Sequence, residues 1–414
     1  MRQPLLDVLR LLDTVPAPRG RERTAAHRLR AWCADRWPHI DWQVLEHGPE
    51  GGSLFAARGA GPLLYSHLDT SLDDGAATVN RLVTGDAAPV GPLAVGGDTV
   101  SGFGIGVARG PAAAALVAFA EAESESAAET GADTARGPVR GSVRGQLLLA
   151  GSGTHRCGGG AGGTTAVTGL EAYADTHPLP RSAIVAKCGP PTLLWHEPGA
   201  FYLTVKVTGR SGAAMLAESA APPGGVVAHA GVVLDELARW REAYLAADPR
   251  QGQTGRACGI GAISGGWPGK PDLLPAQLRI GLYVVAGDPV QPASLGAELA
   301  GRLRARCARS ALRDCAVDVA VEPVAAAAAT PPDAPVVTAA RAAWSDEFGA
   351  QPPPITGWTG STDGVELRAR GVDTVRLGPQ ARPADGDPRR DALSLTQLES
   401  YARIYRRLLT ELPA

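Results

Sequence analysis

The chain has 414 residues, of which 44% are hydrophobic and 20% are charged, and its formal net charge is −2. Such a chain is long enough for two domains and a large core. The near-neutral charge excludes the strongly basic surface that binds nucleic acid or anionic membranes. We also expect no membrane-spanning helix, because no apolar run approaches about 18 residues. Neither nucleic acid nor a membrane is therefore expected as a partner.

The amino-terminal stretch and the cysteines predict a cytoplasmic protein. Residues 1–15 form an amphipathic pattern that includes Asp7 and Asp13 and lacks a small-residue cleavage site, so we do not interpret them as a signal peptide. The six cysteines are scattered and form no C-x-x-C pair. Reduced thiols are therefore expected, and neither a disulfide framework nor a zinc knuckle.

The first 70 residues predict two helices followed by three strands. Apolar residues recur at helical spacing over Leu5–Leu12 and again over Ala25–Cys33. Asp41–Leu45 and Ser53–Ala57 are typical of short strands separated by a turn. Leu63–Tyr65 follows as a short, fully apolar run, which is typical of a buried strand in a mostly parallel sheet.

The middle of the chain alternates apolar and polar segments. Pro111–Ala122 is predicted to be an apolar helix, and residues 123–145 are polar and of low complexity, which predicts a flexible insertion. Gln146–Ala150 and Ala183–Ala186 are predicted as further buried strands. These strands and helices together indicate an α/β fold.

Three of the predicted strands are followed by polar residues, namely His67 with Asp69, His155 with Arg156, and Lys187 with Cys188. Parallel strands end at one edge of a sheet, and open α/β sheets place their sites at that edge. We therefore expect these side chains to share one site. A histidine two residues before a carboxylate is also a common metal ligand with its orienting group.

A second unit is predicted to begin near Gly199. Its order is strand, helix, strand, strand, helix, which fits a small α/β sandwich over residues 199–316. After it, Val317–Val321 is predicted to return as a strand of the first unit. Helix Pro335–Phe348, strand Thr374–Leu377 and an amphipathic carboxyl-terminal helix follow.

Six segments in this order resemble the di-zinc aminoacylases, succinyl-diaminopimelate desuccinylases and glutamate carboxypeptidases. GPLLYSHLDT resembles that family's strand ending in H-x-D, and QLLLAGSGTHRCGGG its strand ending in D-E-E-x-G. The other four are VSGFGIGVARG, GAFYLTVKVTGRSGAAM, ISGGWPGKPDLLP and TGSTDGVELRARGVDTVRLGP.

The resemblance implies a larger phosphorylase/hydrolase-like α/β domain with a mixed sheet, formed by residues 1–198 and 317–414. It also implies a smaller α/β lid domain, residues 199–316, which is of the kind through which the family forms homodimers.

Carried over residue by residue, the resemblance implies a dismantled zinc site. His67 matches the zinc-binding histidine and Asp69 its supporting aspartate. The remaining expected metal-site and lid residues are replaced: the bridging aspartate falls at Val107, the general-base glutamate at His155, the next glutamate at Arg156, the later acidic ligand near Lys187, the late histidine near Gly386 and the lid histidine at Ala213. A catalytic zinc site needs about three protein ligands. We therefore expect neither zinc nor any other cofactor.

Three hypotheses remain for the function. The first is a metal-independent enzyme that performs acyl transfer, condensation or cyclisation on a small amide-bearing or amino-acid-like molecule, as in specialised metabolism. The second is a catalytically inactive scaffold, and the third is a residual amidohydrolase. For the first, His67, Asp69 and His155 are the catalytic residues, and the substrate-binding residues are Arg156, Lys187, Thr362 and Asp363. Cys157 or Cys188 is either a nucleophile or a small packing residue.

Overall fold

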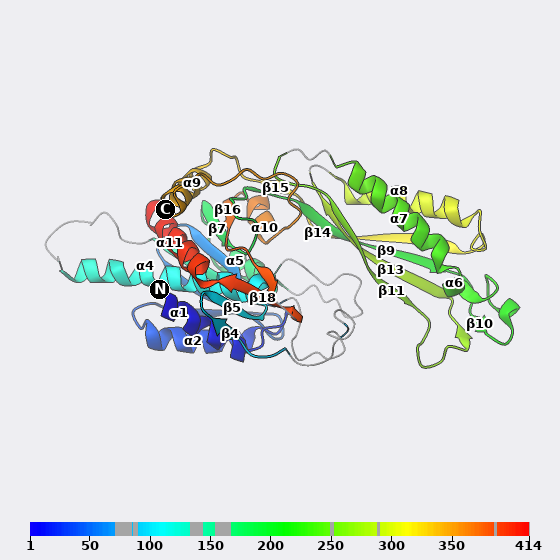
Figure 1. The fold of residues 1–414 in the computed structure, drawn as a ribbon, viewed down its shortest axis with the longest axis horizontal. Coiled ribbons are helices and arrows are strands. Elements are labelled where there is room, and N and C mark those ends of the chain that lie inside the picture. The colour runs from blue at the N-terminus through cyan, green and yellow to red at the C-terminus, as the bar shows by residue number, and fades with distance from the viewer. Residues whose placement is uncertain are drawn as a thin grey trace.

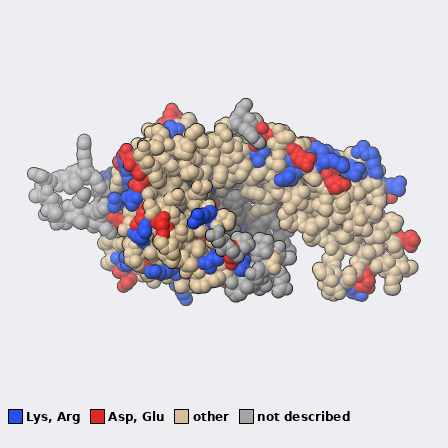
Figure 2. All heavy atoms as spheres, viewed as in Figure 1, with Lys and Arg blue, Asp and Glu red and all other residues tan. Residues whose placement is uncertain are grey.

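The computed structural model describes residues 1–70, 85, 90–132, 144–153, 167–248, 252–287, 290–384 and 387–413, with the side chains of 123–132 and 388 excepted. These residues form two lobes joined side by side along the long axis of the molecule (Figure 1). On the face drawn in Figure 2, Lys and Arg side chains lie among Asp and Glu side chains on both lobes. This face thus has the mixed character expected from the near-neutral charge.

The larger lobe is built on a six-stranded mixed sheet. Its order is β1 (Gln43–His47), β2 (Gly51–Arg58), β6 (Gly145–Ala150), β3 (Leu63–His67), β7 (Ser182–Ala186) and β16 (Asp373–Leu377). The last four strands are mutually parallel, whereas β1 and β2 run antiparallel to their neighbours. The predicted mixed α/β fold is confirmed.

Side-chain alternation along these strands builds two hydrophobic layers. Leu64 faces one layer, whereas Leu63 and Tyr65 face the other. Successive residues of a strand point to opposite faces, so a strand buried on both must be apolar throughout. The first layer is covered by α1 (Arg2–Thr14), α2 (Arg23–Arg36), α4 (Gly110–Ala132), α9 (Pro335–Phe348) and α11 (Leu395–Glu411). The second is covered by α5 (Gly169–Thr176) and α10 (Gly364–Ala369).

Helix α4 corrects two expectations. It continues to Ala132, so the first part of the predicted insertion at 123–145 is helical. Residues 133–143 lie outside the described residues, and Gly145 already belongs to β6. In the described part of the chain, the 18-residue window Ile105–Ala122 is also long and apolar enough to cross a membrane. That window is 89% buried between the sheet and neighbouring helices, which is the environment of a core helix.

The smaller lobe is an antiparallel sheet with helices on one face. Its strand order is β11 (Ala257–Gly265), β13 (Gln277–Ala286), β9 (Gly199–Thr208) and β14 (Ala316–Ala325), and its covering helices are α7 (Ala230–Ala246) and α8 (Pro292–Cys307). Short elements at its far end are β10 (Gly212–Ala213), η2 (Ala217–Ser219), α6 (Gly225–Ala228) and β12 (Leu273–Leu274).

Strand β14 shows that the predicted domain boundary at 316/317 is misplaced. The predicted strand Val317–Val321 was assigned to the larger unit, but it pairs with β9 along the smaller lobe's sheet. Its apolar side chains complete that sheet, so the chain returns to the larger lobe only after Ala325. There β15 (Ala328–Ala329) pairs with β8 (His196–Glu197), and these two short strands connect the lobes.

A second small sheet closes the larger lobe near the amino-terminal helices. It has the order β17 (Arg382–Ala384), β18 (Asp387–Ser394), β5 (Thr99–Phe103) and β4 (Ala94–Gly96). The first half of β18, DPRRD, is rich in charged residues, which are uncommon in strands. Pairing with β5, which is far away in the sequence, makes it a strand.

A buried charge network holds β8 against the larger lobe. The Glu197 carboxylate is fully buried and accepts hydrogen bonds from Arg368 Nη1 (2.6 Å) and Arg376 Nη1 (3.0 Å). The Thr362 hydroxyl also lies 2.8 and 2.9 Å from its two oxygens. Burial raises the pKa of Glu197, but the two arginines outweigh that effect and hold the pKa below its ordinary value.

We expect Glu197→Gln to lower the free energy of unfolding by about 3–5 kcal/mol at neutral pH, because it leaves two buried guanidinium groups without their counter-charge. Since the pKa of Glu197 is lowered by folding, its stabilising effect is present above the unfolded-state pKa and is lost as the pH falls through the folded-state value. Urea denaturation at a series of pH values measures this difference.

The control is Asp318→Asn, which removes an exposed ion pair with Lys206 and should cost less than about 1 kcal/mol. Equal losses in the two variants at neutral pH would contradict the central role given to Glu197.

Candidate functional site

The site lies where the parallel strands β6, β3 and β7 end together. His67 is the last residue of β3 and pairs in register with Ala150, the last residue of β6. The Ser66 hydroxyl donates to the carbonyl of Ala186 at the end of β7 (2.9 Å). Parallel pairing therefore fixes all three strand ends at one edge of the sheet, as the sequence predicts.

Asp69 orients the His67 ring. His67 Nδ1 lies 3.0 Å from the Asp69 carbonyl oxygen and 3.2 Å from its Oδ1. The amide of Gly153 donates to the same Oδ1 (3.1 Å), which fixes the carboxylate. Both acceptors lie at Nδ1, so Nδ1 carries the proton and Nε2 is left as the acceptor of a neutral ring. The predicted histidine–aspartate pair is present.

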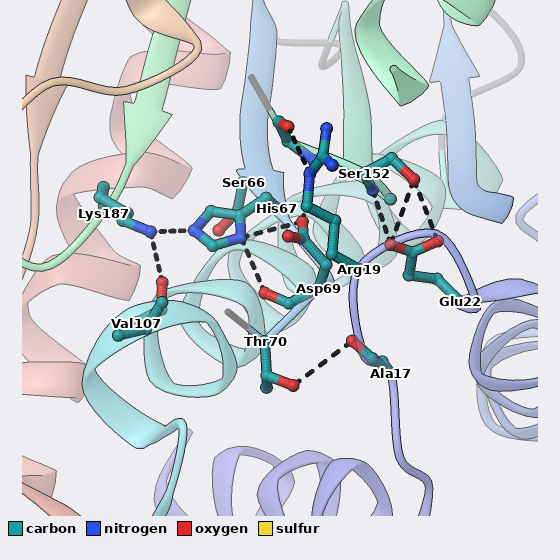
Figure 3. Close-up of polar contacts among 12 residues, drawn as sticks. Ala17, Arg19, Glu22, Ser66, His67, Asp69, Thr70, Val107, Ser152 and Lys187 are labelled. Carbon is teal, nitrogen blue, oxygen red and sulfur yellow. Dashed lines mark hydrogen bonds and ion pairs between the residues drawn. The ribbon is translucent and has the colours of Figure 1, made fainter. Parts of the chain in front are cut away.

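Lys187 occupies the other side of the ring (Figure 3). Its Nζ is hydrogen-bonded to His67 Nε2 and donates to the carbonyl of Val107 at 2.5 Å. Lys187 directly follows β7, so the sheet positions it. Val107 lies in a π-helix, Ile105–Arg109, which begins after Gly104 in a left-handed conformation (φ +65°). Lys187 therefore reaches the centre of the site.

The protonation of His67 depends on charges at both ring nitrogens. Burial lowers the pKa of His67, but the carboxylates of Asp69 and Asp363 outweigh burial and raise it above the ordinary value. Lys187 Nζ is hydrogen-bonded to Nε2, and this nitrogen can accept such a bond only while it carries no proton of its own.

Thr362 and Asp363, which the sequence predicts as substrate-binding residues, have different surroundings in the structure. Asp363 is buried beside Asp69: a Cβ built on Gly153 would lie 3.4 Å from a carboxylate oxygen of each. Asp363 thus belongs to the site. Thr362 instead donates to Glu197 and accepts from the amide of Gly364, so its hydroxyl is engaged in the network between the lobes. His155 and Arg156 lie outside the described residues.

Two residues that the sequence reasoning missed come from the loop before α2. Glu22 is fully buried and accepts from the amides of Gly20 (2.6 Å) and Ser152 (2.8 Å). Burial, together with the nearby Asp69 carboxylate, raises its pKa. Arg19 Nε donates to the Gly153 carbonyl (3.2 Å), and its buried Nη2 has no hydrogen-bond partner among the described residues.

The sequence offered little signal for either residue. A glutamate directly before a helix is usually a solvated residue at the helix start, and Arg19 belongs to no pattern. Glu22 holds Ser152, which has a positive φ of 52°, at the point where β6 ends. These contacts make Glu22 a support of the site's backbone.

Cys188 and Arg109 have structural roles. Cys188 packs against the hydrophobic core, and burial raises the pKa of its thiol far above the ordinary value, so it is no ready nucleophile. Arg109 pairs with Asp13 (3.0 Å) and donates to the Phe103 carbonyl (2.7 Å), which pins the loop before α4.

Several solved hydrolases have the same architecture. A tripeptidase from Staphylococcus aureus matches with a TM-score of 0.65 and 14% identity, covering 99% of this chain and 98% of its own. An M20 family metallo-carboxypeptidase from Sulfolobus solfataricus has a TM-score of 0.67 and 13% identity, with 99% of both chains covered. An amidase of the hydantoinase/carbamoylase family from Burkholderia vietnamiensis matches with a TM-score of 0.63 and 16% identity, covering 99% of this chain and 97% of its own. No protein-family model and no curated protein sequence matches the chain.

The chain has the fold of the M20 metallopeptidases. This confirms the resemblance seen in the sequence and the arrangement of a larger lobe with a smaller one inserted. Identities of 16% and below carry the fold and not the activity, which depends on the residues at the site.

The described residues do not fit the metal centre that an M20 metallopeptidase fold implies. Within them, no group of three or more His, Cys, Asp or Glu side chains is arranged to hold a metal ion. His67 Nε2, the ring atom facing the centre of the site, is occupied by Lys187. Two unit positive charges about 4 Å apart repel each other by about 4 kcal/mol at an effective dielectric of about 20. The repulsion between the Lys187 ammonium and a divalent metal ion at that distance would be about twice as large.

We expect Asp69→Asn to lower the pKa of His67 by about one unit or more, because it removes the nearest opposite charge. A pKa raised by folding stabilises the protein below the unfolded-state value, and this contribution is lost as the pH rises through the folded-state pKa. The stability lost in the variant should therefore be largest in acid.

NMR titration of isotope-labelled histidines measures this pKa, with His67→Gln providing the assignment. The matched control is Asp318→Asn, which changes an aspartate of the smaller lobe. An unchanged pKa in Asp69→Asn would mean that Asp69 orients the ring without contributing charge.

Proposed function

We propose that this protein is a metal-independent enzyme that acts on a small amide-bearing or amino-acid-like molecule. The observation that carries the proposal is the contact of Lys187 Nζ with His67 Nε2. It supports a site in which a side-chain cation takes the place of a metal ion. The cytoplasm is the proposed location, and zinc is not a proposed cofactor.

Lys187 is the proposed group for a developing negative charge on the substrate. An ammonium group has three N–H donors, and among the residues that the structure describes His67 and Val107 take two of them. The third is available to a carbonyl oxygen that becomes an oxyanion during acyl transfer. Arg156, which the sequence predicts at the neighbouring strand end, is a second candidate for the same role.

His67 is the proposed general acid and base. When the carbonyl oxygen of a bound substrate draws Lys187 away from Nε2, that nitrogen is free to accept the proton of the attacking nucleophile and, as the tetrahedral intermediate collapses, to give it to the leaving group. Asp69 stabilises the imidazolium formed in between. His155 remains the second candidate for this proton transfer.

The proposed reactions are acyl transfer, condensation or cyclisation. The solved structures of similar fold include a tripeptidase, human carnosine dipeptidase 1 and a carbamoylase-family amidase, all of which are named for amide-bearing or peptide substrates. A pocket inherited with that fold supports a substrate of similar size. A role in specialised metabolism would fit such chemistry.

Zinc binding tests the central claim. Elemental analysis of the purified protein, before and after incubation with zinc and removal of the excess, should find far less than one zinc per chain, because Lys187 already neutralises the site. Lys187→Met should bind zinc no more than weakly, since removing the cation does not supply the missing ligands. Tight, stoichiometric zinc in the unmodified protein would overturn the proposal.

Activity on N-acyl amino acids and their amides separates the alternatives. We expect product formation that survives a chelator and falls about 100-fold or more in Lys187→Met and His67→Gln, the scale seen when one oxyanion donor or acid–base group is removed. Arg210→Met, far out on the smaller lobe, is the control.

Each alternative function has its own signature. Chelator-resistant hydrolysis that requires His155 would indicate a residual amidohydrolase. No activity and no binding of any tested amide would favour the inactive scaffold.

A homodimer through the smaller lobe is also proposed. Strand β11 is the edge of its sheet, and its Ile260 and Ile263 side chains are exposed. An exposed apolar edge strand is a template for pairing with a second copy. Ile263→Lys should convert a dimer into a monomer in sedimentation velocity, whereas Met215→Lys, outside β11, should not. A wild-type protein that sediments as a monomer at high concentration would exclude the dimer.

A further inference from the structure

The loop Gly357–Asp363 contacts both lobes and also carries a residue of the site. It connects α9 to α10, and Figure 1 shows α10 beside β15, where the larger lobe meets the smaller one. Asp363 stands at its end, directly before α10. The loop is held at two points, and both belong to the segments that join the lobes.

The first point is a backbone ladder to the segment that links α7 with β11. The Trp358 amide donates to the Gln253 carbonyl (2.7 Å), and the Gly255 amide donates to the Trp358 carbonyl (2.9 Å). The two segments are so close that a Cβ on Gly255 would lie 2.7 Å from the Gly357 carbonyl oxygen. Only glycine fits at position 255 without moving the loop.

Gln253 fastens the same segment to the strand that enters the smaller lobe. Its side chain is 6% exposed, and its Oε1 accepts from the amides of Trp195 (2.9 Å) and His196 (3.1 Å). Its Nε2 donates to the Leu193 carbonyl (2.8 Å). A buried amide with three such hydrogen bonds is costly to displace.

The second point is Thr362, whose hydroxyl donates to Glu197 on β8. Thr362 precedes Asp363, whose carboxylate lies with that of Asp69 around Gly153. The position of Asp363 beside the His67 site is therefore set at one end by Glu197 and at the other by the Gln253 ladder. Both are elements that a rotation of the smaller lobe would move.

We propose that Gln253 is a positioning residue, which transmits the orientation of the smaller lobe through the loop Gly357–Asp363 to Asp363 in the His67 site. The inference depends only on these contacts and not on the proposed reaction. A change of lobe orientation, whether on substrate or partner binding, shifts the carboxylate beside His67 and so changes the charge that His67 experiences.

The test is amide hydrogen exchange of the full chain, followed by mass spectrometry. Gln253→Met keeps the volume of the side chain and removes its three hydrogen bonds. The matched control is Gln146→Met, because Gln146 is also 6% exposed and hydrogen-bonded, but to Tyr173 within the larger lobe. Gly255→Ala is a second variant, which opens the same ladder and leaves the Gln253 side chain unchanged.

We expect Gln253→Met and Gly255→Ala to raise exchange about tenfold or more in the peptides that cover 359–367, and Gln146→Met to change them less than about twofold. A purely local role for Gln253 predicts faster exchange only around 193–196, 253–255 and 357–358. That result, or an equal effect of the control, would overturn the proposal. A failure of the proposed enzymatic function would leave this outcome unchanged.

Discussion

The hydrogen bond between Lys187 and His67 determines the charge balance of the whole site. Three buried carboxylates, Glu22, Asp69 and Asp363, lie around the end of β3. Buried carboxylates remain ionised only where positive charge or hydrogen-bond donors compensate for the lost water. In a metallated site an ion provides that charge, and in this chain the ammonium of Lys187 lies at the corresponding face of the histidine.

The sheet explains why this contact is so well defined. His67 and Lys187 follow neighbouring parallel strands, and the register of β3 with β6 and β7 fixes where each strand ends. A shift of one residue would turn each side chain to the opposite face of the sheet. The apolar residues before them, such as Leu64 and Ile184, prevent that shift because both faces of the sheet are buried. Packing of the hydrophobic core thus positions both His67 and Lys187.

Sequence reasoning predicted the parts of the site that lie directly after strands. His67, Asp69 and Lys187 were predictable because a short apolar run shows where a buried strand ends. Glu22 and Gln253 were not, because their partners, Ser152 and Leu193, are far away in the sequence and no pattern links them. The same reason explains the misplaced boundary at 316/317: β14 is an ordinary alternating strand, and only its pairing with β9 assigns it to the smaller lobe.

The hydrogen bond between Lys187 and His67 also limits what the site can do at rest. While Lys187 donates to Nε2, His67 is neither a free base nor an imidazolium, and general acid–base catalysis needs one of the two. A substrate oxygen that attracts the ammonium would release Nε2 at the moment when a base is required. Asp363 and Asp69 favour a positive charge on the ring at that stage. In the mechanism that we propose, activation of His67 therefore depends on substrate binding, and the elements that position Asp363 influence how readily it occurs.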